Sequence, residues 1–512
     1  MKQGRALSVA LVGLSATLVE VETAVGGGLP RTVIVGLPDT ALTEARERCR
    51  AAVAHLGHPW PSQLVTVNLS PASLPKRGSH YDVAIVASVL AAEDLVPDAS
   101  LAGTVLVGEL ALDGRVRPAR GLLPVVLEAQ RSGCRRVIVP APQVAEGRLV
   151  TGIEIIGVET LAELVGILRG EPAFEHEIPI LAADPEVTPD LADVAGQIEA
   201  RWAIEVAAAG GHHLFLHGPP GVGKTLLAER LPGVLPPLSD EAALEVSALR
   251  SIAGGSLASG LVRRAPFSAP HHTASVASLV GGGARIARPG AVSLAHHGVL
   301  FLDEAPEFSP RALEALRTPL ESGVMVLARS EAQTTYPARF QLVLAANPCP
   351  CGLRGSSAGV CSCSAMAVRR YAERLSGPIL DRIDVRCQLR PMTQSYLRAA
   401  AGRAECSAVV AERVLAARER QRHRLAPRGW ETNAAVPGPY LRRELPLPDG
   451  IEVLESAVAR GQLSARGVDK VLKVAWTLAD LAERDRPAQG DLLAALAMRR
   501  GERGEEAVDG GA

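Results

Sequence analysis

One segment near the middle of the chain constrains the fold more than any other. It reads Gly218-Pro219-Pro220-Gly221-Val222-Gly223-Lys224-Thr225, follows an apolar run at 214–217 and precedes a helical pattern at 226–230. Glycines allow backbone N–H groups to close around phosphate oxygens, and a helix N-terminus adds a favourable dipole. The segment therefore predicts an α/β domain with a phosphate-binding loop, in which Lys224 neutralises the β- and γ-phosphates of ATP and Thr225 binds Mg²⁺.

Two later strand patterns end in residues that suit hydrolysis. The apolar segment 299–302 leads into Asp303 and Glu304, and the segment 341–345 leads to Asn347. After a phosphate loop, Asp303 fits a position beside Mg²⁺, and Glu304 fits the polarisation of the attacking water. Asn347 fits a sensor that contacts the γ-phosphate or that water. Together these residues predict ATP hydrolysis, not binding alone.

Two arginines further along suit catalytic sensing. Arg382, in the segment 377–384, fits an arginine finger that reaches the ATP of a neighbouring subunit. Arg466, near the start of a helix that follows Leu463 and Ser464, fits a second sensor in the lid. Each arginine alone would more often be a surface or ion-pair residue, but their order after the phosphate loop favours the catalytic roles. A finger that acts on a neighbour requires a ring, so a hexamer is expected.

The length of the chain implies several domains. A chain of 512 residues is too long for one hydrophobic core. Alternating strand and helix patterns predict an α/β domain, an acidic and proline-rich linker, a second α/β domain with helices on both faces of its sheet, and a helical lid. The expected boundaries are 1–172, 173–189, 190–391, 392–503 and, for a disordered tail, 504–512. In the first domain, strands are expected at 6–12, 33–35, 64–68, 104–109 and 136–139, and helices at 40–56, 83–90 and 122–132.

Composition limits the class of protein. The net charge of −1 means that any nucleic-acid site must be a local patch. No apolar run approaches the roughly 18 residues of a membrane span. Lys2 and Arg5 precede the apolar run 6–12, but that run is short and lacks a convincing cleavage site, so it predicts a first strand and not an export signal. A cytoplasmic location without membrane contact is expected.

Four of the eight cysteines lie in one short loop. Their spacing is Cys349-x-Cys351, nine residues, then Cys361-x-Cys363. Four thiolates suit a closed, structural Zn²⁺ site, although C-x-C pairs are tighter than the usual spacing. Four reduced thiols without a metal are the alternative. The histidine pairs 271–272 and 296–297 lack the i,i+4 spacing and the nearby carboxylates that would indicate a metal site.

Several longer segments carry a resemblance to a known family. They are Val35-Gly36-Leu37-Pro38-Asp39, Asn68-Leu69-Ser70-Pro71-Ala72, Ala269-Pro270-His271-His272-Thr273-Ala274-Ser275, Ser293-Leu294-Ala295-His296-His297-Gly298 and Asn347-Pro348-Cys349-Pro350-Cys351-Gly352. Through them, residues 1–500 resemble the ComM/YifB family of Mg-chelatase-like AAA+ ATPases. The resemblance implies a hexameric motor that acts on single-stranded or branched DNA, with a role in branch migration during natural transformation. Composition and spacing alone do not point to DNA.

The same resemblance implies two insertions that face a central pore. The first lies around 263–289, and the second is a hairpin around 323–338. Basic residues on such loops suit phosphate contacts. Solvated loop charges or ion pairs between subunits are an equal alternative, because Phe267 and Tyr336 are the only aromatic candidates for base stacking. The candidate DNA contacts are Arg263, Arg264, His271, His272, Arg285, Arg288 and Arg329.

The first domain is similar to the Lon-protease fold, an α/β fold of the S5 domain 2-like type. Lon-like proteases carry a catalytic serine shortly after a Pro-Lys-x-Gly segment. Here the segment 75–78 is followed by Ser79 and His80, and His80 occupies the usual serine position. The helix expected at 122–132 has no lysine to serve as a base, and a serine nucleophile needs one. No peptidase activity is expected, so the domain should bind DNA or a partner, or shape the ring.

Other functions remain open beside a DNA motor. A chelatase-type motor would drive metal insertion into a tetrapyrrole, although a Lon-like first domain is not expected in a chelatase ATPase subunit. A machine that remodels a protein partner fits the pairing of a Lon-like domain with an AAA+ motor. A non-enzymatic scaffold is the poorest alternative, since every hydrolytic element is present.

Overall fold

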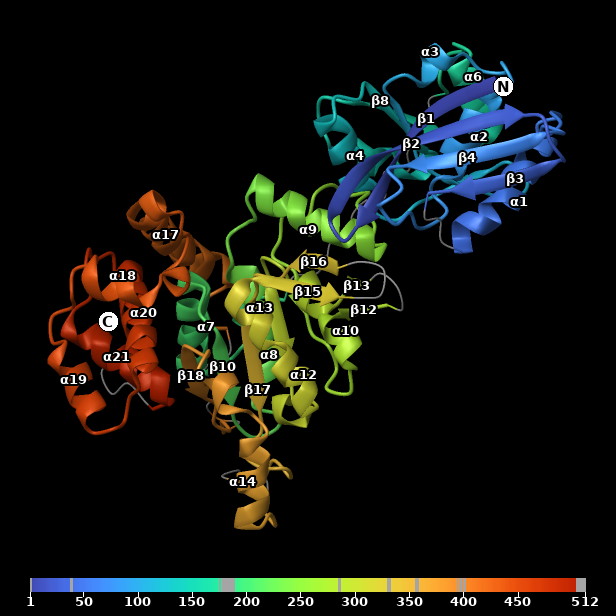
Figure 1. The fold of residues 1–512 in the computed structure, drawn as a ribbon. Helices are drawn as coiled ribbons and strands as arrows, with labels where there is room; N and C mark the ends of the chain where they lie inside the picture. Colours follow the sequence, from blue (N-terminus) through green and yellow to red (C-terminus); the bar gives the residue numbers. More distant parts are fainter. Residues whose placement is uncertain are drawn as a thin grey trace.

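The computed structural model describes residues 2–36, 40–174, 176, 189–283, 287–328, 333–354, 359–393, 395, 398 and 402–502. Figure 1 shows an N-terminal α/β domain and a group of C-terminal helices on opposite sides of a central domain. Most of the expected linker and all of the expected tail lie outside the described residues. The described helices include none that is long and apolar enough to cross a membrane.

The N-terminal domain is built on a seven-stranded sheet with the order β3-β4-β2-β1-β5-β8-β9. β1 and β2 pair antiparallel along their length and are joined by a tight turn at Gly13, whose φ of 69° favours glycine. All residues of α2 are buried, which explains why this helix is apolar on every side. The strands are β1 (Lys2–Val12), β2 (Ser15–Gly26), β3 (Arg31–Val35), β4 (Leu64–Ser70), β5 (Thr104–Leu106), β8 (Arg136–Pro140) and β9 (Glu154–Val158), with a small hairpin of β6 (Glu109–Leu110) and β7 (Val116–Arg117). The helices are α1 (Thr40–His55), α2 (Asp82–Ala92), α3 (Asp98–Leu101), α4 (Leu122–Arg131), α5 (Val144–Gly147) and α6 (Leu161–Leu168), with a 3-10 turn η1 (Ala141–Gln143).

Two differences from the predicted elements concern this sheet. The strand predicted at 104–109 ends at Leu106, and the chain turns at Gly108 with a φ of 155° before β6 begins. β2 was missing from the predicted strands. Its alternation of exposed or half-buried residues with buried ones is the pattern of a strand with one face in the core.

The central domain contains a five-stranded parallel sheet with the order β11-β14-β17-β10-β18. Alternate residues of β10, β14 and β17 face different cores: Val343 and Ala345 of β17 pack with α7 and α8, whereas Leu342 and Leu344 pack with α12. Burial on both faces explains the continuous apolar runs and confirms the predicted α/β class. The strands are β10 (Leu214–His217), β11 (Phe267–Ser268), β14 (Val299–Leu302), β17 (Gln341–Ala346) and β18 (Val385–Gln388). The helices are α7 (Ile198–Gly210), α8 (Lys224–Val234), α9 (Asp240–Ala253), α10 (Val276–Val280), α11 (Ala291–Leu294), α12 (Pro310–Ala315), α13 (Arg317–Ser322), α14 (Ala365–Glu373) and α15 (Gly377–Leu380), with 3-10 turns η2 (Leu191–Asp193) and η3 (Ala305–Glu307).

Two hairpins extend from the central domain at the predicted insertions. They are β12 (Gly281–Gly282) with β13 (Arg288–Pro289), and β15 (Val324–Ala328) with β16 (Gln333–Pro337). The hairpins pack together, because the Tyr336 hydroxyl donates to the Ala287 carbonyl at 2.8 Å. Arg285 and Arg329, two predicted DNA contacts, lie outside the described residues.

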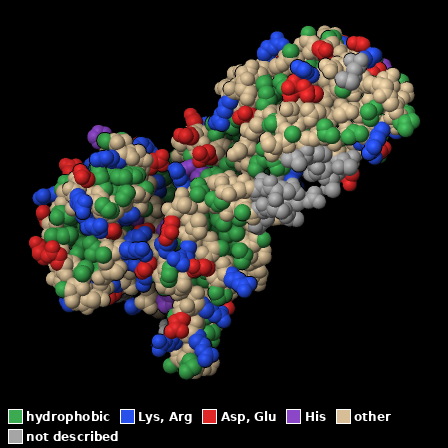
Figure 2. Space-filling model, viewed as in Figure 1, with side chains coloured by type: hydrophobic (Ala, Val, Ile, Leu, Met, Phe, Trp, Pro, Cys, Tyr) green, Lys and Arg blue, Asp and Glu red, His purple; other side chains and the backbone are tan. Residues whose placement is uncertain are grey.

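The C-terminal helices share one core with the sheet of the central domain. Leu472 and Ala475 of α20 belong to the same buried cluster as Leu214 and Leu216 of β10. The lid is therefore packed onto the strand that leads to the phosphate loop. Its helices are α17 (Ser407–Leu425), α18 (Gly438–Arg443), α19 (Glu452–Ala459), α20 (Ala465–Leu481) and α21 (Gln489–Arg500), with 3-10 turns η4 (Ala426–Arg428) and η5 (Asn433–Ala435). Figure 2 shows Lys and Arg side chains interspersed with Asp and Glu on the visible face of these helices.

The N-terminal domain contacts the central domain through α9. Ala248 of α9 packs into the same core as Leu122 and Val126 of α4. The Gly121 N–H donates to the Ser251 carbonyl at 3.1 Å, and the Ser251 hydroxyl donates to a carboxylate oxygen of Glu146. α9, the helix that follows α8, is thus packed against the N-terminal domain.

The junction between sheet and lid predicts a dependence of stability on pH. His212 is fully buried and its Nε2 lies 2.8 Å from the Thr477 hydroxyl of α20. Burial lowers the pKa of His212 to about 3, whereas an unfolded histidine titrates near about 6.5. The unfolded state therefore binds the proton more readily, so the stabilisation is complete above about pH 6.5 and decreases as the pH falls toward the folded pKa. At pH 5 the expected loss is roughly 2 kcal/mol of unfolding free energy.

Denaturant midpoints at pH 7.5 and pH 5 measure this loss. The His212→Gln variant should show a smaller decrease between the two pH values than the wild type. His423→Gln, at an exposed position of α17, should leave the decrease unchanged. An equal decrease in His212→Gln and in wild type would contradict the assignment.

Candidate nucleotide-hydrolysis site

The phosphate loop joins β10 to α8 at the carboxyl edge of the parallel sheet. Gly221 and Gly223 have φ values of 77° and 95°, which allow the backbone to curl around a small space. The Lys224 ammonium donates to the carbonyls of Gly218 at 2.6 Å and Pro219 at 2.8 Å. Burial lowers the pKa of Lys224, and the charges of Asp303 and Glu304 oppose that shift. The predicted loop thus has the shape that its glycines implied.

The expected Mg²⁺ residues lie together. The Thr225 hydroxyl donates to Asp303 Oδ2 at 2.6 Å, and Asp303 Oδ1 accepts the Glu304 N–H at 2.9 Å. β14 and β10 both neighbour β17, so their carboxyl ends converge. A hydroxyl beside a carboxylate is a set of hard oxygen donors that fits Mg²⁺.

Asn347 reaches the same group of residues from β17, the strand between β14 and β10. It follows β17, and its Oδ1 accepts from Lys224 Nζ at 3.0 Å. β17 lies between β14 and β10. Asn347, the predicted sensor, therefore follows the strand that lies between those leading to the phosphate loop and to the two acids.

Glu304 contacts a residue for which the sequence suggested another role. Its backbone has a φ of 50°, an uncommon value for a residue other than glycine, and its Oε2 lies 3.2 Å from His272 Nδ1. A cavity of about 270 Å³ is lined by both side chains together with Thr225, Glu229 and Asp303. The family resemblance implies DNA contacts for His271 and His272, whereas in the structure both residues line this cavity beside Thr225 and Asp303.

Strand register could have revealed this pair. Phe267 of β11 pairs in parallel with Val299 of β14. His272 and Glu304 each lie five residues beyond these partners. Parallel strands in register bring such positions to the same edge, but the pairing of β11 with β14 is known only from the tertiary structure.

Arg382 and Arg466 lie near each other at the boundary with the lid. The Arg382 guanidinium pairs with Glu321 of α13 and donates to the Pro378 carbonyl at 2.6 Å. Burial, together with the positive charges of Arg317 and Arg466, lowers the pKa of Arg382. Arg466 is exposed at the start of α20. In the single chain the predicted finger is thus held by α13 and α15.

The four loop cysteines are grouped at the phosphate loop. Cys349 Sγ lies 3.4 Å from Cys351 Sγ and 3.7 Å from Cys361 Sγ, and all four sulfurs, including that of Cys363, lie within 4.8 Å of one another. A tetrahedron with Zn–S bonds of about 2.3 Å has edges of about 3.8 Å, so the spacing fits Zn²⁺. A methyl group added at Gly352 would lie 2.7 Å from Pro220 of the phosphate loop. The cysteine loop therefore packs against the phosphate loop.

A second cluster arises from residues that the sequence did not connect. Glu245 of α9 accepts from His296 Nε2 at 2.8 Å and from His297 Nε2 at 3.2 Å, so a carboxylate does lie beside this histidine pair. His296 Nδ1 accepts the Arg339 N–H at 3.0 Å, which leaves the ring proton on Nε2. That tautomer donates to Glu245 and leaves no lone pair on Nε2 for a metal. The cluster is a set of hydrogen bonds between α9 and the segment that joins α11 to β14.

The remaining DNA candidates have different surroundings. Arg263 pairs with Asp240 at the start of α9, and Arg288 is exposed on β13. Arg264 approaches Gly233 at the end of α8. Tyr336 is buried and Phe267 stacks on Phe301, with ring centroids 5.9 Å apart. Neither aromatic is presented as a platform for base stacking.

The residues expected at a Lon-type site make other contacts. The Ser79 hydroxyl donates to Glu109, and the buried Lys76 donates to the Pro71 carbonyl. His80 Nε2 lies 2.9 Å from the Val9 carbonyl. Burial raises the pKa of nearby Asp82 to about 6, although the paired Arg48 opposes the shift. Ser79 and Lys76 thus have separate partners.

Comparison with known proteins covers almost the whole chain. A family model described as magnesium chelatase, subunit ChlI, matches residues 190–397; one described as subunit ChlI of Mg-chelatase matches 21–143; and one described as subunit ChlI C-terminal matches 404–499. Because a chelatase-subunit model also matches the first domain, that domain does not argue against a chelatase, contrary to our sequence argument. Lon protease 2 of Bacillus subtilis is 33% identical over 109 residues, 21% of this chain and 19% of that protein, which supports the Lon-like character.

Longer relatives define the family. A Mycobacterium tuberculosis protein is 53% identical over 98% of this chain and 99% of its own length. YifB of Escherichia coli is 41% identical and the competence protein ComM of Haemophilus influenzae is 39% identical, each over 96% of both chains. These matches confirm the resemblance derived from the motifs. The chain belongs to the ComM/YifB family of Mg-chelatase-like AAA+ ATPases.

Proposed function

We propose that this chain is the subunit of an ATP-hydrolysing hexameric ring that moves or remodels DNA in the cytoplasm. The proposal of ATP hydrolysis rests on one observation. Lys224 and Thr225, at the end of the phosphate loop, contact Asn347 after β17 and Asp303 after β14 at one edge of the sheet. DNA as the substrate rests on the 39% identity with a competence protein and on the two hairpins packed side by side in the central domain.

Some of these side chains bind the phosphates and Mg²⁺, and others activate the attacking water. Lys224 holds the β- and γ-phosphates, and Thr225 with Asp303 would hold Mg²⁺, which neutralises charge on the phosphate oxygens when bound. Glu304 accepts a proton from the attacking water, and His272 fixes the position of its carboxylate. Asn347 orients the water or the γ-phosphate. Arg382 of the adjacent subunit completes the site.

The test is steady-state ATPase activity with and without single-stranded DNA and a four-way junction, across a salt series. Stimulation by DNA should decrease steeply as salt rises, because phosphate contacts release counterions. Lys224→Ala serves as the blank. Hydrolysis that is indifferent to DNA at every salt concentration would refute the DNA motor and leave the ATPase.

A protein-directed motor is the second candidate, favoured by the chelatase family models that match all three parts of the chain. A chelatase-type motor would need partner subunits, and a remodelling motor would be stimulated by unfolded protein. ATPase stimulation by casein, but not by DNA, would favour remodelling. Activation only by tetrapyrrole-enzyme partners would favour a chelatase.

We also propose that the four-cysteine loop binds one structural Zn²⁺. Metal analysis of purified protein should find about one zinc per chain, since four thiolates close a single tetrahedral site. Cys361→Ser should lose the metal and most of the ATPase activity, because the loop packs on Pro220. Cys134→Ser, in the N-terminal domain, should keep both. Full activity in zinc-free wild type would contradict a role in shaping the site.

A further inference from the structure

The turn that carries the predicted finger is held by cations from the lid. We define the finger turn as residues 380–384, between α15 and β18. Lys470 Nζ of α20 donates to the Arg382 carbonyl at 3.0 Å. Arg499 of α21 donates to the carbonyls of Leu380 at 3.4 Å and of Ile383. Two lid helices therefore fix the backbone on both sides of the arginine.

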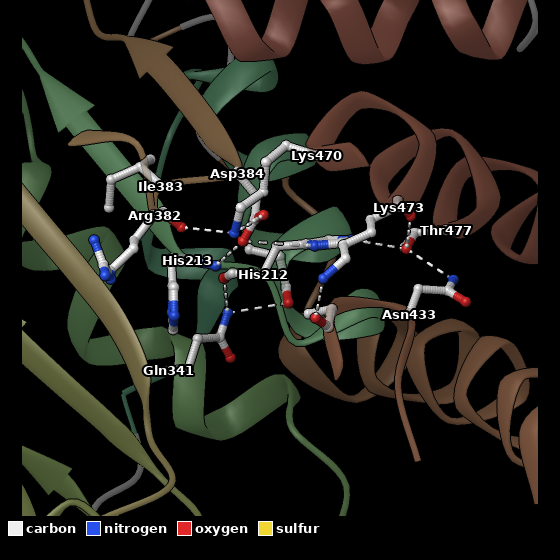
Figure 3. A network of polar contacts seen from close by, with 12 residues as sticks. His212, His213, Gln341, Arg382, Ile383, Asp384, Asn433, Lys470, Lys473 and Thr477 are labelled. Atoms are coloured by element: carbon white, nitrogen blue, oxygen red, sulfur yellow. Dashed lines mark hydrogen bonds and ion pairs between the residues drawn. The ribbon is translucent and has the colours of Figure 1, made fainter. Parts of the chain in front are cut away.

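The buried side chain of Asp384 connects Lys470 to the parallel sheet. Asp384 is 1% exposed, and its Oδ1 lies 2.7 Å from Lys470 Nζ. Its Oδ2 accepts the N–H of His213 at 2.9 Å, and His213 directly precedes β10. Burial alone would raise the pKa of Asp384, but the charge and hydrogen bond of Lys470 oppose burial, and the pKa of Asp384 lies well below its usual range. Figure 3 shows Lys470 between Asp384 and the Arg382 carbonyl, while the Arg382 guanidinium points away from it.

Lys470 is also linked, through Asp384 and the His213 N–H, to the start of β10, the strand that leads into the phosphate loop of the same chain. Lys470 lies one turn after Arg466, the predicted lid sensor, on the same face of α20. A helix moves as a rigid rod over such a distance, so a shift of α20 that follows nucleotide binding at the end of β10 would move Lys470 and Arg466 together. That movement would reach the finger turn through the Arg382 carbonyl.

We propose that Lys470 is a positioning residue, which, with Arg499, transmits the position of the lid to the finger offered to the next subunit. This inference rests on the proposed ring ATPase. It assigns to the lid a role in the neighbour's hydrolysis: the nucleotide state of one subunit sets the geometry of Arg382 at the adjacent site. Arg382 is paired with Glu321 of its own chain, so its guanidinium must leave Glu321 before the finger reaches the adjacent site.

The chain offers a matched control on the same helix. Lys473 is also buried, and burial lowers its pKa to about 8. Its ammonium donates to the Ala434 carbonyl at 2.7 Å, which belongs to the lid. Lys473→Met therefore removes a buried lysine contact within the lid, whereas Lys470→Met removes one of the two lid cations that contact the finger turn.

The experiment measures ATPase kinetics of both variants and then mixes subunits. Lys470→Met should lower kcat by about 10- to 100-fold with little change in KM, since small misplacement of a catalytic group has effects of this size. Lys470→Arg should recover most of the rate, and Lys473→Met should stay within about twofold of wild type. Rings mixed from Lys470→Met and Lys224→Ala subunits should exceed the sum of the two separate activities. The first subunit keeps an intact ATP site, and the second supplies a well-placed finger.

The possible failures are distinguishable. If Arg382→Ala subunits are rescued by Lys224→Ala but Lys470→Met subunits are not, the inference is refuted and the trans finger stands. Lys470→Met with wild-type kcat also refutes it. Absence of ATPase activity in the wild type refutes the proposed function itself. If Lys470→Met does not fold, as judged by its melting curve, Arg499→Met carries the same test through the second cation.

Discussion

Replacing Glu304 by glutamine is expected to lower the kcat of ATP hydrolysis by about 10²- to 10⁴-fold, the usual contribution of a general base. Glu304 follows β14 directly after Asp303, and its carboxylate faces the cavity that Thr225 also lines. Glutamine keeps the shape but cannot accept the proton of the attacking water. Binding of ATP should persist, because the phosphate loop and Asp303 are unchanged. Single-turnover hydrolysis and a nucleotide-binding titration measure the two quantities separately.

Glu307 provides the matched control for this substitution. It lies three residues further along and pairs with Arg374 at 2.7 Å. Glu307→Gln removes the same charge from the same segment and should keep kcat within about twofold, as expected for a partly exposed pair. If Glu304→Gln hydrolysed ATP as fast as Glu307→Gln, the assignment of Glu304 as the base would be wrong.

Replacing Arg382 by alanine should reduce kcat by about 10³-fold or more, the lower end of what an arginine finger contributes. The side chain belongs to the boundary between α15 and the lid, and its contacts are Glu321 and Pro378 of its own chain. Since it acts on charge that develops in the transition state, KM for ATP should change little. Arg369→Ala, which removes an exposed arginine of α14, should leave both constants near wild type.

The dependence on a neighbour separates a finger from a structural arginine. Arg382→Ala subunits retain their own ATP site, so mixing them with Lys224→Ala subunits should restore hydrolysis at the mixed interfaces. If Arg382→Ala lowered activity only because Arg382 no longer pairs with Glu321, the defect would lie within one chain. A neighbouring Lys224→Ala subunit would then not restore hydrolysis. A mixture that stays as inactive as its components would rule out the trans role of Arg382.

The hydrolysis site could be predicted from the sequence because its residues follow strands in a fixed way. Lys224, Asp303 and Asn347 each come directly or closely after an apolar strand. Carboxyl ends of parallel strands share one edge of a sheet, so residues at those ends meet regardless of how far apart they lie in the chain. The contacts of Lys224 with Asn347 and of Thr225 with Asp303 follow that rule.

Contacts made by side chains from loops and from separate helices could not be predicted in this way. His272 approaches Glu304 only because β11 pairs with β14 in one particular register. Glu245 joins His296 and His297 because α9 packs against α11, which directly precedes the histidine pair, and no spacing in the sequence records that packing. Tyr336 appeared available for stacking in the sequence, but the packing of two hairpins buries it.

The sequence by itself determined the class of the fold, the phosphate loop, the acid pair and the family, because these depend on local patterns and on the order of strands. Only the tertiary structure shows that the lid helices α20 and α21 contact the backbone of the finger turn. Lys470 and Asp384 are far apart in the chain, yet they form a buried ion pair at 2.7 Å. A buried charge is stable only when its partner is placed beside it. That placement depends on how α20 packs against β10 and β18, which is a property of the assembled core and not of any segment of the sequence.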